Sequence, residues 1–198
     1  MTSILISINP KWCELIVNGK KTIEVRKTRP KIETPFKCYI YCTMGDKLWV
    51  TTERFRVICN GKSASIINAK DVGGCYLGNG KVIGEFVCDE IFPIRVFENG
   101  TIQDYMFHGA EKSCVPYDDI ANYIGNDCIG YGWRISDLEI YDNPRELSEF
   151  GRGCDAENIG EIRCRDCKKL VSFDDCCEIM CKPLNRPPQS WCYVEELP

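Results

Sequence analysis

Cysteine is the residue type whose number and spacing suggest chemistry most directly in this chain. The sequence holds 15 cysteines but a single histidine, His108. Two residues separate Cys164 from Cys167, so both thiolates can face one ion from a tight turn, and a second group of cysteines follows about ten residues later. We expect one tetrahedral Zn²⁺ site with four thiolate ligands, which would be structural because no coordination position stays open. The preferred ligands are Cys164, Cys167, Cys177 and Cys181.

Other uses of these cysteines remain open from the sequence. Cys176 is an alternative to Cys177, and Cys154 is a further candidate for the fourth ligand. Thiolates also bind iron–sulfur clusters, and disulfide bonds are a third possibility. The N-terminus has no signal-peptide pattern, because Asn9, Pro10 and Lys11 interrupt a short apolar run, and no run reaches the roughly 18 apolar residues of a membrane span. We therefore expect a cytoplasmic protein, where thiols stay reduced and metal binding is favoured.

Charged residues form a second pattern with chemical meaning between positions 19 and 26. Residues 22–26 alternate in polarity with a period of two, so Glu24 and Arg26 are expected on one strand face. Basic side chains here can contact phosphates, and Glu24 can accept from a base amino group or hold the neighbouring cations. The simpler interpretation is an exposed row of ion pairs that contributes little to stability. The candidate nucleic-acid-binding residues are Lys20, Lys21, Thr22, Glu24 and Arg26.

Composition and charge limit the class of protein. With 198 residues, 44% hydrophobic and 27% charged, the chain fits one ordinary globular domain, or one domain with a small appendage. It is neither collagen-like nor wholly disordered nor a coiled coil. The net charge of −4 is unevenly distributed, since residues 1–62 carry +7 and the remainder carries −11. A basic first third can present an anion-binding surface, although a merely solvated basic face gives the same balance.

The elements that must position these residues can be outlined from local signals. Residues 3–8 predict a strand, and Asn9 with Pro10 predicts the start of a helix that ends at Gly19. Further strands are expected in three segments and a short helix in one. The strands are 36–43, 54–59 and 128–141, and the helix is 116–124.

Three segments between these elements are less regular. The segment 44–53 is expected to be a polar loop and 60–80 a long loop, while 81–97 predicts a long strand with a bend or break at Pro93. A short helix is expected over 145–150.

The composition changes near residue 143. Residues 151–186 hold six cysteines and few large apolar side chains. This segment therefore cannot form a core of its own and needs cross-links, such as a bound metal ion, to stabilise it. The aromatic residues that follow predict a tail that packs back on the main domain. We therefore predict two regions, a main domain over 1–142 and a Cys-rich metal-binding appendage with its tail over 143–198.

The segment from Ile4 to Arg26 resembles the opening of ASCH domains, which belong to the PUA-like superfamily. The shared pattern is a strand, a helix and then Gly-x-Lys-Thr-x-Glu-x-Arg, which begins here at Gly19. The segments 80–91 and 130–138 are similar to later strands of that family, so the resemblance covers roughly residues 3–142. It implies an α+β fold built on a small PUA-like β-barrel with short flanking helices. It also suggests an origin in phages or gut bacteria, where similar proteins carry a cysteine-rich tail.

The same resemblance implies a nucleic-acid-binding role, with RNA or a modified base held in a cleft near the Gly-x-Lys-Thr-x-Glu-x-Arg motif. Trp12, Trp49 and Tyr39 are candidate stacking residues, although for Trp12 we expect core packing on the inward face of its helix.

The resemblance also leaves an enzymatic alternative. One ASCH branch is an acetylcytidine amidohydrolase that uses a lysine, a threonine and a glutamate. Its lysine matches Lys21, its threonine position is occupied by Glu24, and Glu85 is only a conceivable stand-in for its glutamate. Another ASCH protein is described as a ribonuclease, but no nuclease pattern is recognisable, and the lone His108 is weak support for a general base. A third possibility is an accessory protein of a phage that binds a host protein through the Cys-rich tail.

Overall fold

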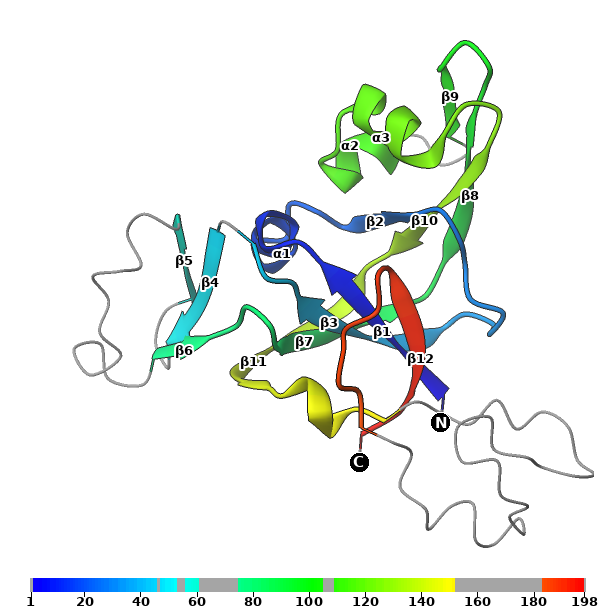
Figure 1. The fold of residues 1–198 in the computed structure, drawn as a ribbon. Coiled ribbons are helices and arrows are strands. Elements are labelled where there is room, and N and C mark those ends of the chain that lie inside the picture. Colours follow the sequence, from blue (N-terminus) through cyan, green and yellow to red (C-terminus); the bar gives the residue numbers. More distant parts are fainter. Residues whose placement is uncertain are drawn as a thin grey trace, which may run out of the picture.

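The computed structural model describes residues 2–45, 47–52, 56–60, 75–104, 109–151 and 183–197. In these ranges the chain forms three β-sheets and a few short helices (Figure 1). This confirms the predicted α+β class. None of the helices in these ranges combines the length and the apolar character needed to cross a bilayer.

The largest sheet has five strands in the order β11-β7-β3-β1-β12. Its members are β1 (Thr2–Ile8), β3 (Phe36–Cys42), β7 (Val82–Cys88), β11 (Ser136–Arg145) and β12 (Trp191–Glu195). The strands β1 and β3 are parallel and all other neighbours are antiparallel. The tail therefore packs back on the main domain as predicted, and it does so by adding β12 to the free edge of β1.

Two smaller sheets complete the described part of the fold. The four-stranded sheet has the order β2-β10-β8-β9 and is antiparallel throughout. Its strands are β2 (Ile23–Arg26), β8 (Ile91–Val96), β9 (Ile102–Asp104) and β10 (Ile129–Arg134). The three-stranded sheet, β5-β4-β6, consists of β4 (Lys47–Thr52), β5 (Arg56–Asn60) and β6 (Cys75–Leu77).

A bent two-stranded ribbon joins the two larger sheets. The chain passes from β7 to β8 at residues 89–90 and from β10 to β11 at residue 135, and each pair of strands stays antiparallel on both sides of the bend. Arg134 fastens this corner. Its Nε and Nη2 donate to the two carboxylate oxygens of Asp89 at 2.7 and 3.0 Å, and its Nη1 lies 2.7 Å from Glu90 Oε2.

The described strands do not close into the single barrel that the family resemblance implied. Because β1 is already hydrogen-bonded to β3 on one side and to β12 on the other, it has no free edge for β2. The strand β2 is accordingly an edge of its own sheet. The gap between β1 and β2 is bridged by side chains, which form the site described below.

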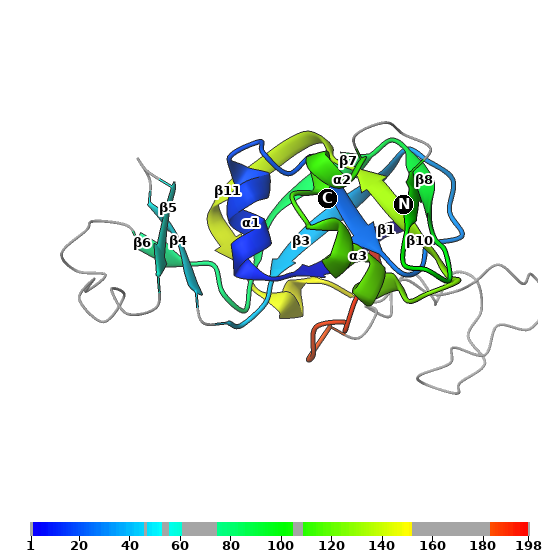
Figure 2. The same cartoon turned by 90° about the horizontal axis from the view of Figure 1, so that it is seen from above.

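The first helix follows the local signals closely. In α1 (Pro10–Val17), Pro10 is the first residue and the Asn9 side chain accepts from the Lys11 N–H at 3.1 Å. Gly19, with φ of +68°, follows the helix end as expected. Two more helices, α2 (Gly109–Ser113) and α3 (Tyr117–Ile124), lie on the side of β2 away from the five-stranded sheet (Figures 1 and 2).

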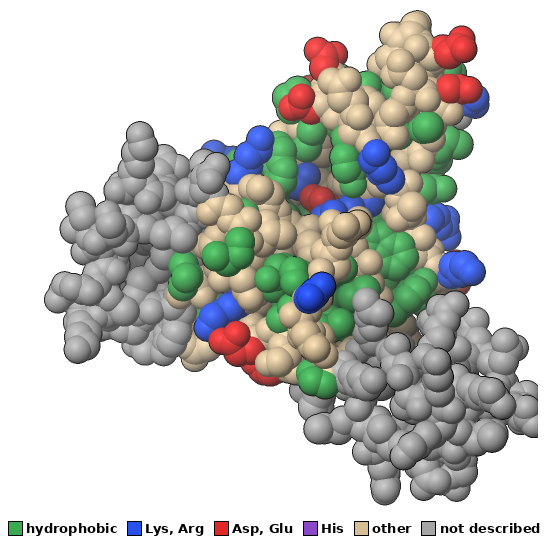
Figure 3. Space-filling view, in the orientation of Figure 1, with side chains coloured by type: hydrophobic (Ala, Val, Ile, Leu, Met, Phe, Trp, Pro, Cys, Tyr) green, Lys and Arg blue, Asp and Glu red, His purple; other side chains and the backbone are tan. Residues whose placement is uncertain are grey.

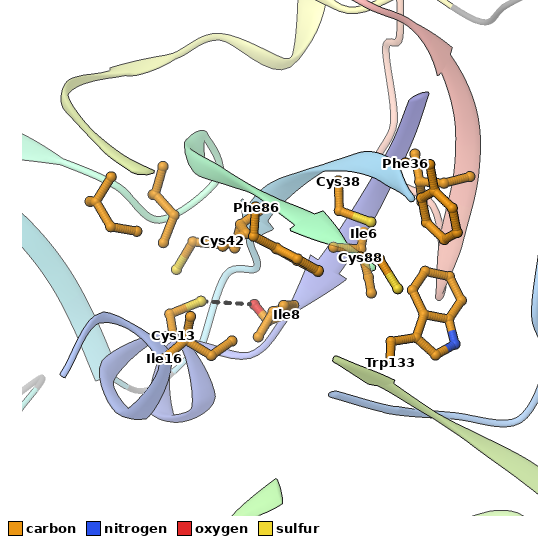
Figure 4. Packing of buried hydrophobic residues seen from close by; sticks show 14 residues of the cluster. Ile6, Ile8, Cys13, Ile16, Phe36, Cys38, Cys42, Phe86, Cys88 and Trp133 are labelled. Carbon is orange, nitrogen blue, oxygen red and sulfur yellow. Dashed lines mark hydrogen bonds between the residues drawn. The ribbon is translucent and has the colours of Figure 1, made fainter. Parts of the chain in front are cut away.

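The main core lies on one face of the five-stranded sheet, against α1 at one end and Trp133 of β10 at the other (Figure 4). Four of its members are free cysteines: Cys13, Cys38, Cys42 and Cys88. Burial raises the pKa of the Cys13 and Cys38 thiols well above the ordinary range and that of Cys88 to about 12. The thiols of Cys13, Cys38 and Cys88 therefore stay protonated and pack as small hydrophobic groups.

Several predicted boundaries are wrong. The segment 44–53, expected to be a loop, contains β4, and the expected strand 128–141 is two strands separated by Ile135. Pro93 lies inside β8. The break that was expected at Pro93 occurs instead at the Asp89–Glu90 corner, before β8 begins. The expected helix over 145–150 is a single 3₁₀ turn at Leu147–Glu149.

Candidate functional site

Lys21, Glu24 and Arg26 come together in the gap between β1 and β2. Their relative exposures are only 2%, 6% and 7%, so the interpretation as an exposed row of ion pairs is wrong. Glu24 lies between the two cations, with Oε2 at 3.1 Å from Lys21 Nζ and Oε1 at 3.0 Å from Arg26 Nη2. We refer to these three residues as the charged network. Since it holds two cations and one carboxylate, it carries one excess positive charge in a buried position.

Lys21 is held by backbone carbonyls as well as by Glu24. Its Nζ donates to the carbonyl oxygens of Ile23 at 2.9 Å and Ser113 at 2.7 Å. Three oxygen atoms thus surround the nitrogen, which is the arrangement expected of an ammonium group. Because Ser113 is the last residue of α2, Lys21 also fastens that helix to β2.

Arg26 connects β2 to two other parts of the chain. Its Nη2 donates to the Ser7 carbonyl of β1 at 2.6 Å, and its Nη1 donates to Ser190 Oγ, just before β12, at 3.4 Å. Ser7 is itself bonded to this segment, since its hydroxyl donates to the Pro188 carbonyl at 2.7 Å. The guanidinium therefore bridges three segments that are far apart in the sequence.

Two buried atoms of the charged network lack an aligned hydrogen bond within the described residues. They are Arg26 Nε and Glu24 Oε2, the latter in charge contact with Lys21 but outside hydrogen-bond alignment. Buried polar groups in native proteins are nearly always satisfied, and an unmade bond costs about 1–3 kcal/mol. The network therefore carries an energetic cost at this position.

The charged network forms the floor of a cavity of about 340 Å³ between α1, β2 and α3. Trp12 of α1 lines one wall, and Asp119 and Tyr123 of α3 line the other. In the space-filling view a hollow opens below α2 and α3, with acidic and basic side chains at its bottom (Figure 3). Its volume lies at the lower end of the range for sites that bind small molecules.

A lysine lies over the aromatic ring of each wall. Lys11 Nζ is 4.2 Å from the centre of the Trp12 ring, and Lys27 Nζ is 5.2 Å from the centre of the Tyr123 ring. Both lysines are exposed. The buried Lys21 also approaches Trp12, at 5.3 Å from the ring centre. Each distance is within the range of cation–π attraction.

The remaining candidates of the motif do not line this cavity. Lys20 is exposed, and its carbonyl accepts from the Cys114 thiol at 3.3 Å. Thr22 is half-buried, and its backbone bonds to Lys112 and Ile135, both at 2.9 Å. These residues fasten the neighbouring segments to β2.

Of the candidate stacking residues whose side chains the structure describes, Trp12 lies at the cavity and Tyr39 does not. Trp12 is half-buried, so it packs against the core as expected and also lines the wall. Tyr39 is fully buried, packs at 4.9 Å from the Phe150 ring and accepts from the Leu197 N–H at 2.9 Å, which excludes it from stacking on a ligand in this structure. The side chain of Trp49 lies outside the described part of the chain.

Glu85 belongs to a different charged group on the five-stranded sheet. It pairs with Lys37 at 2.8 Å and accepts from the Tyr141 hydroxyl. Burial alone would raise the pKa of Glu85, but the bonds from Lys37 and Tyr141 outweigh it and hold that pKa below the ordinary value. Glu85 does not line the cavity, so it does not complete a catalytic set with Lys21 and Glu24.

The expected metal ligands lie outside the described residues. These are Cys164, Cys167, Cys177 and Cys181 with the substitutes Cys154 and Cys176, and His108 is also outside. Within the described ranges, no group of three or more His, Cys, Asp and Glu side chains is arranged to hold a metal ion.

Sequence reasoning missed four residues around the cavity: Lys11, Lys27, Asp119 and Tyr123. In the sequence, Lys11 and Lys27 contributed only to the positive charge of residues 1–62, and nothing marked them as binding residues. Asp119 and Tyr123 are exposed residues of the helix expected over 116–124, about 100 residues from the motif. No local signal places α3 over β2.

Comparisons with known proteins identify the family. The chain is similar to the crystal structure of an ASCH protein from Zymomonas mobilis, at 16% identity and a TM-score of 0.49 over 98% of this chain and 88% of the other. A Tyr-to-Phe mutant of that protein gives the same identity and score over 91% of its length. A search of curated proteins finds no match. The profile of the ASCH domain family matches residues 6–183, and this chain therefore belongs to the ASCH domain family.

Proposed function

We propose that this protein is an RNA-binding module that holds one nucleobase or nucleoside in the cavity above the charged network. The observation that carries the proposal is a buried, incompletely satisfied group of charges at the floor of a cavity with aromatic walls. Membership of the ASCH family agrees with a nucleic-acid-related role.

The chemistry of the cavity suits such a ligand. An aromatic wall stacks on any base, and such stacking contributes about 1–3 kcal/mol per base. Glu24 and Arg26 line the cavity, and a carboxylate and a guanidinium are groups that pair with the amino groups, ring nitrogens and carbonyl oxygens of base edges. The excess positive charge of the network also favours the negative potential of a nucleic acid.

Equilibrium binding of fluorescent single-stranded RNA tests the proposal. The key variants are Trp12→Leu, which keeps apolar packing but removes the stacking surface, and Arg26→Gln, with Lys81→Gln as a control because Lys81 pairs with Glu146 and does not line the cavity. We expect roughly tenfold weaker binding for the first two and no change for the control. If both cavity variants are folded by circular dichroism and bind RNA as tightly as the wild type, the cavity is not the RNA-binding site.

The enzymatic alternative uses the same residues, with Lys21 and Glu24 as catalytic groups of an acetylcytidine-type amidohydrolase. The carbonyls of Ile23 and Ser113 argue against it, since they accept hydrogen bonds from Lys21 Nζ and hold it in place between them. The test is release of acetate from N4-acetylcytidine. If the wild type releases acetate and Lys21→Met does not, the protein is an amidohydrolase and the binding proposal is wrong.

We propose that the Cys-rich segment binds one structural Zn²⁺ through Cys164, Cys167, Cys177 and Cys181. The support is the cysteine spacing and the scarcity of large apolar residues over 151–186, which leaves that segment without a core of its own. Metal analysis of protein purified without oxygen should find about one zinc per chain, and less than about half an equivalent contradicts the proposal. Iron with sulfide in the same assay would indicate a cluster instead.

The cytoplasmic location, the phage or gut-bacterial origin and the binding of a host protein stay predictions. Capture of a defined protein that is lost when Cys164 and Cys167 are changed to serine would support the last of these.

A further inference from the structure

We infer that single-stranded RNA crosses the mouth of the cavity with its phosphates at Lys11 and Lys27, and not at the cations of the charged network. This inference rests on the proposed function and assigns the backbone contacts of the same site. It divides the basic residues of the first third of the chain into two groups with different roles.

The buried cations are poorly placed for phosphates. Lys21 Nζ is surrounded by the Ile23 and Ser113 carbonyls and Glu24, and Arg26 is bonded to Glu24, Ser7 and Ser190. A phosphate that reached either cation would have to break these bonds and approach the Glu24 carboxylate. The network is therefore suited to a base edge, which offers donors and acceptors without a full negative charge.

Lys11 and Lys27 meet the requirements for backbone contacts. Both are exposed, and within the described ranges neither makes an ion pair with an acidic side chain. Each lies over the ring of a cavity wall, Lys11 over Trp12 and Lys27 over Tyr123. A phosphate bound at either lysine thus leaves its neighbouring base next to an aromatic ring.

The two lysines also define a direction across the mouth. Lys11 belongs to α1 and lies over Trp12, while Lys27 directly follows β2 and lies over Tyr123 of α3, so a strand that reaches both runs from one aromatic wall to the other. Asp119, exposed on α3, places one negative charge on the same rim. This charge disfavours a phosphate at that position and favours a base, whose amino group can donate a hydrogen bond to the Asp119 carboxylate.

A duplex does not fit this arrangement. Its bases are stacked inside the helix, so no base can enter the cavity while the phosphates follow the two lysines, unless the pair is opened at a cost of a few kcal/mol. The inferred ligand is therefore a single strand.

The salt dependence of RNA binding tests the inference. For single strands, the slope of log Kd against log salt concentration falls by about 0.7 for each phosphate contact that is lost. We expect Lys11→Gln and Lys27→Gln each to reduce the slope by about 0.7 and the double variant by about 1.4. Lys21→Met should weaken binding with an unchanged slope, and Lys81→Gln should change neither.

The outcomes separate this inference from the proposed function. If the double variant keeps the wild-type slope while Trp12→Leu still weakens binding, the phosphate contacts are elsewhere and the cavity proposal stands. A slope that falls with Lys21→Met, or equal affinity for a duplex of the same sequence, also overturns the inference. If the wild-type protein binds no RNA, the proposed function itself fails and the inference fails with it.

Discussion

Glu24 determines the balance of charge in the site, because it is the carboxylate that contacts both Lys21 and Arg26. Alternation of polarity in residues 22–26 correctly put Glu24 and Arg26 near each other. The same pattern could not show that they are buried, since an exposed edge strand alternates in the same way. Lys21 pairs with Glu24 directly, and its Nζ also donates to the Ser113 carbonyl, a contact across 92 positions in the chain that no local signal contains.

Replacing Glu24 by glutamine should strongly destabilise the fold. The change leaves two buried cations without their carboxylate, and removal of one partner from a buried ion pair typically costs about 3–5 kcal/mol. Urea unfolding of Glu24→Gln measures the loss, with the exposed Glu98→Gln as the matched control. A loss below about 1 kcal/mol would show that the network is hydrated and not buried.

Lys37 and Glu85 should make stability depend on pH at the acid end. The pKa of Glu85 is held below its ordinary value of 4.5, so the stabilisation from this pair is fully present above pH 4.5 and is lost as the pH falls through the lowered pKa of the folded protein. The free energy of unfolding of Lys37→Met should therefore differ most from wild type near pH 7 and least near pH 3.

The control for this comparison is Lys31→Met, since Lys31 is exposed and its contact with Tyr193 is made by the backbone. Its difference from wild type should stay constant over the same pH range. A constant difference for Lys37→Met as well would contradict the depressed pKa of Glu85.

At the level of elements, β1 and α1 could be predicted because their signals are local. Asn9, Pro10 and Gly19 mark the helix without help from the rest of the chain. The corner between β7 and β8 could not be predicted, since its stabilising contact joins Asp89 to Arg134, 45 residues away. Pro93 suggested a strand break at the wrong position, because the break is set by this long-range contact and not by the proline.

The close spacing of β7 and β11 should depend on Gly84. A Cβ at this position would meet the Glu139 carbonyl and the side chain of Ile140 on the neighbouring strand. Gly84→Ala should therefore cost about 1–3 kcal/mol in urea unfolding, because β7 also pairs with β3 and cannot move freely. Gly100→Asn is the control, as Gly100 has a φ of +79° that asparagine tolerates and open space around it. If Gly84→Ala is as stable as Gly100→Asn, the close approach of β7 and β11 at Gly84 is contradicted.

In the whole molecule, the site lies where the two larger sheets meet without sharing a hydrogen-bonded edge. The motif supplies its floor, α3 supplies a wall, and Ser190 beside β12 contacts Arg26. The family resemblance implied a closed barrel and not this open gap, because the position of β12 on β1 depends on pairing across nearly the full chain. The gap is what leaves room for a ligand.

The central claim, that RNA enters the cavity above the charged network, is tested most directly by NMR of the tryptophan indole groups. Trp12 lines the cavity, Trp133 is fully buried in the core, and Trp191 donates to Thr28 at 3.1 Å. On addition of single-stranded RNA to ¹⁵N-labelled protein, the Trp12 indole signal, assigned with Trp12→Phe, should shift while those of Trp133 and Trp191 stay in place. An unshifted Trp12 signal when the protein is saturated with RNA would contradict the account.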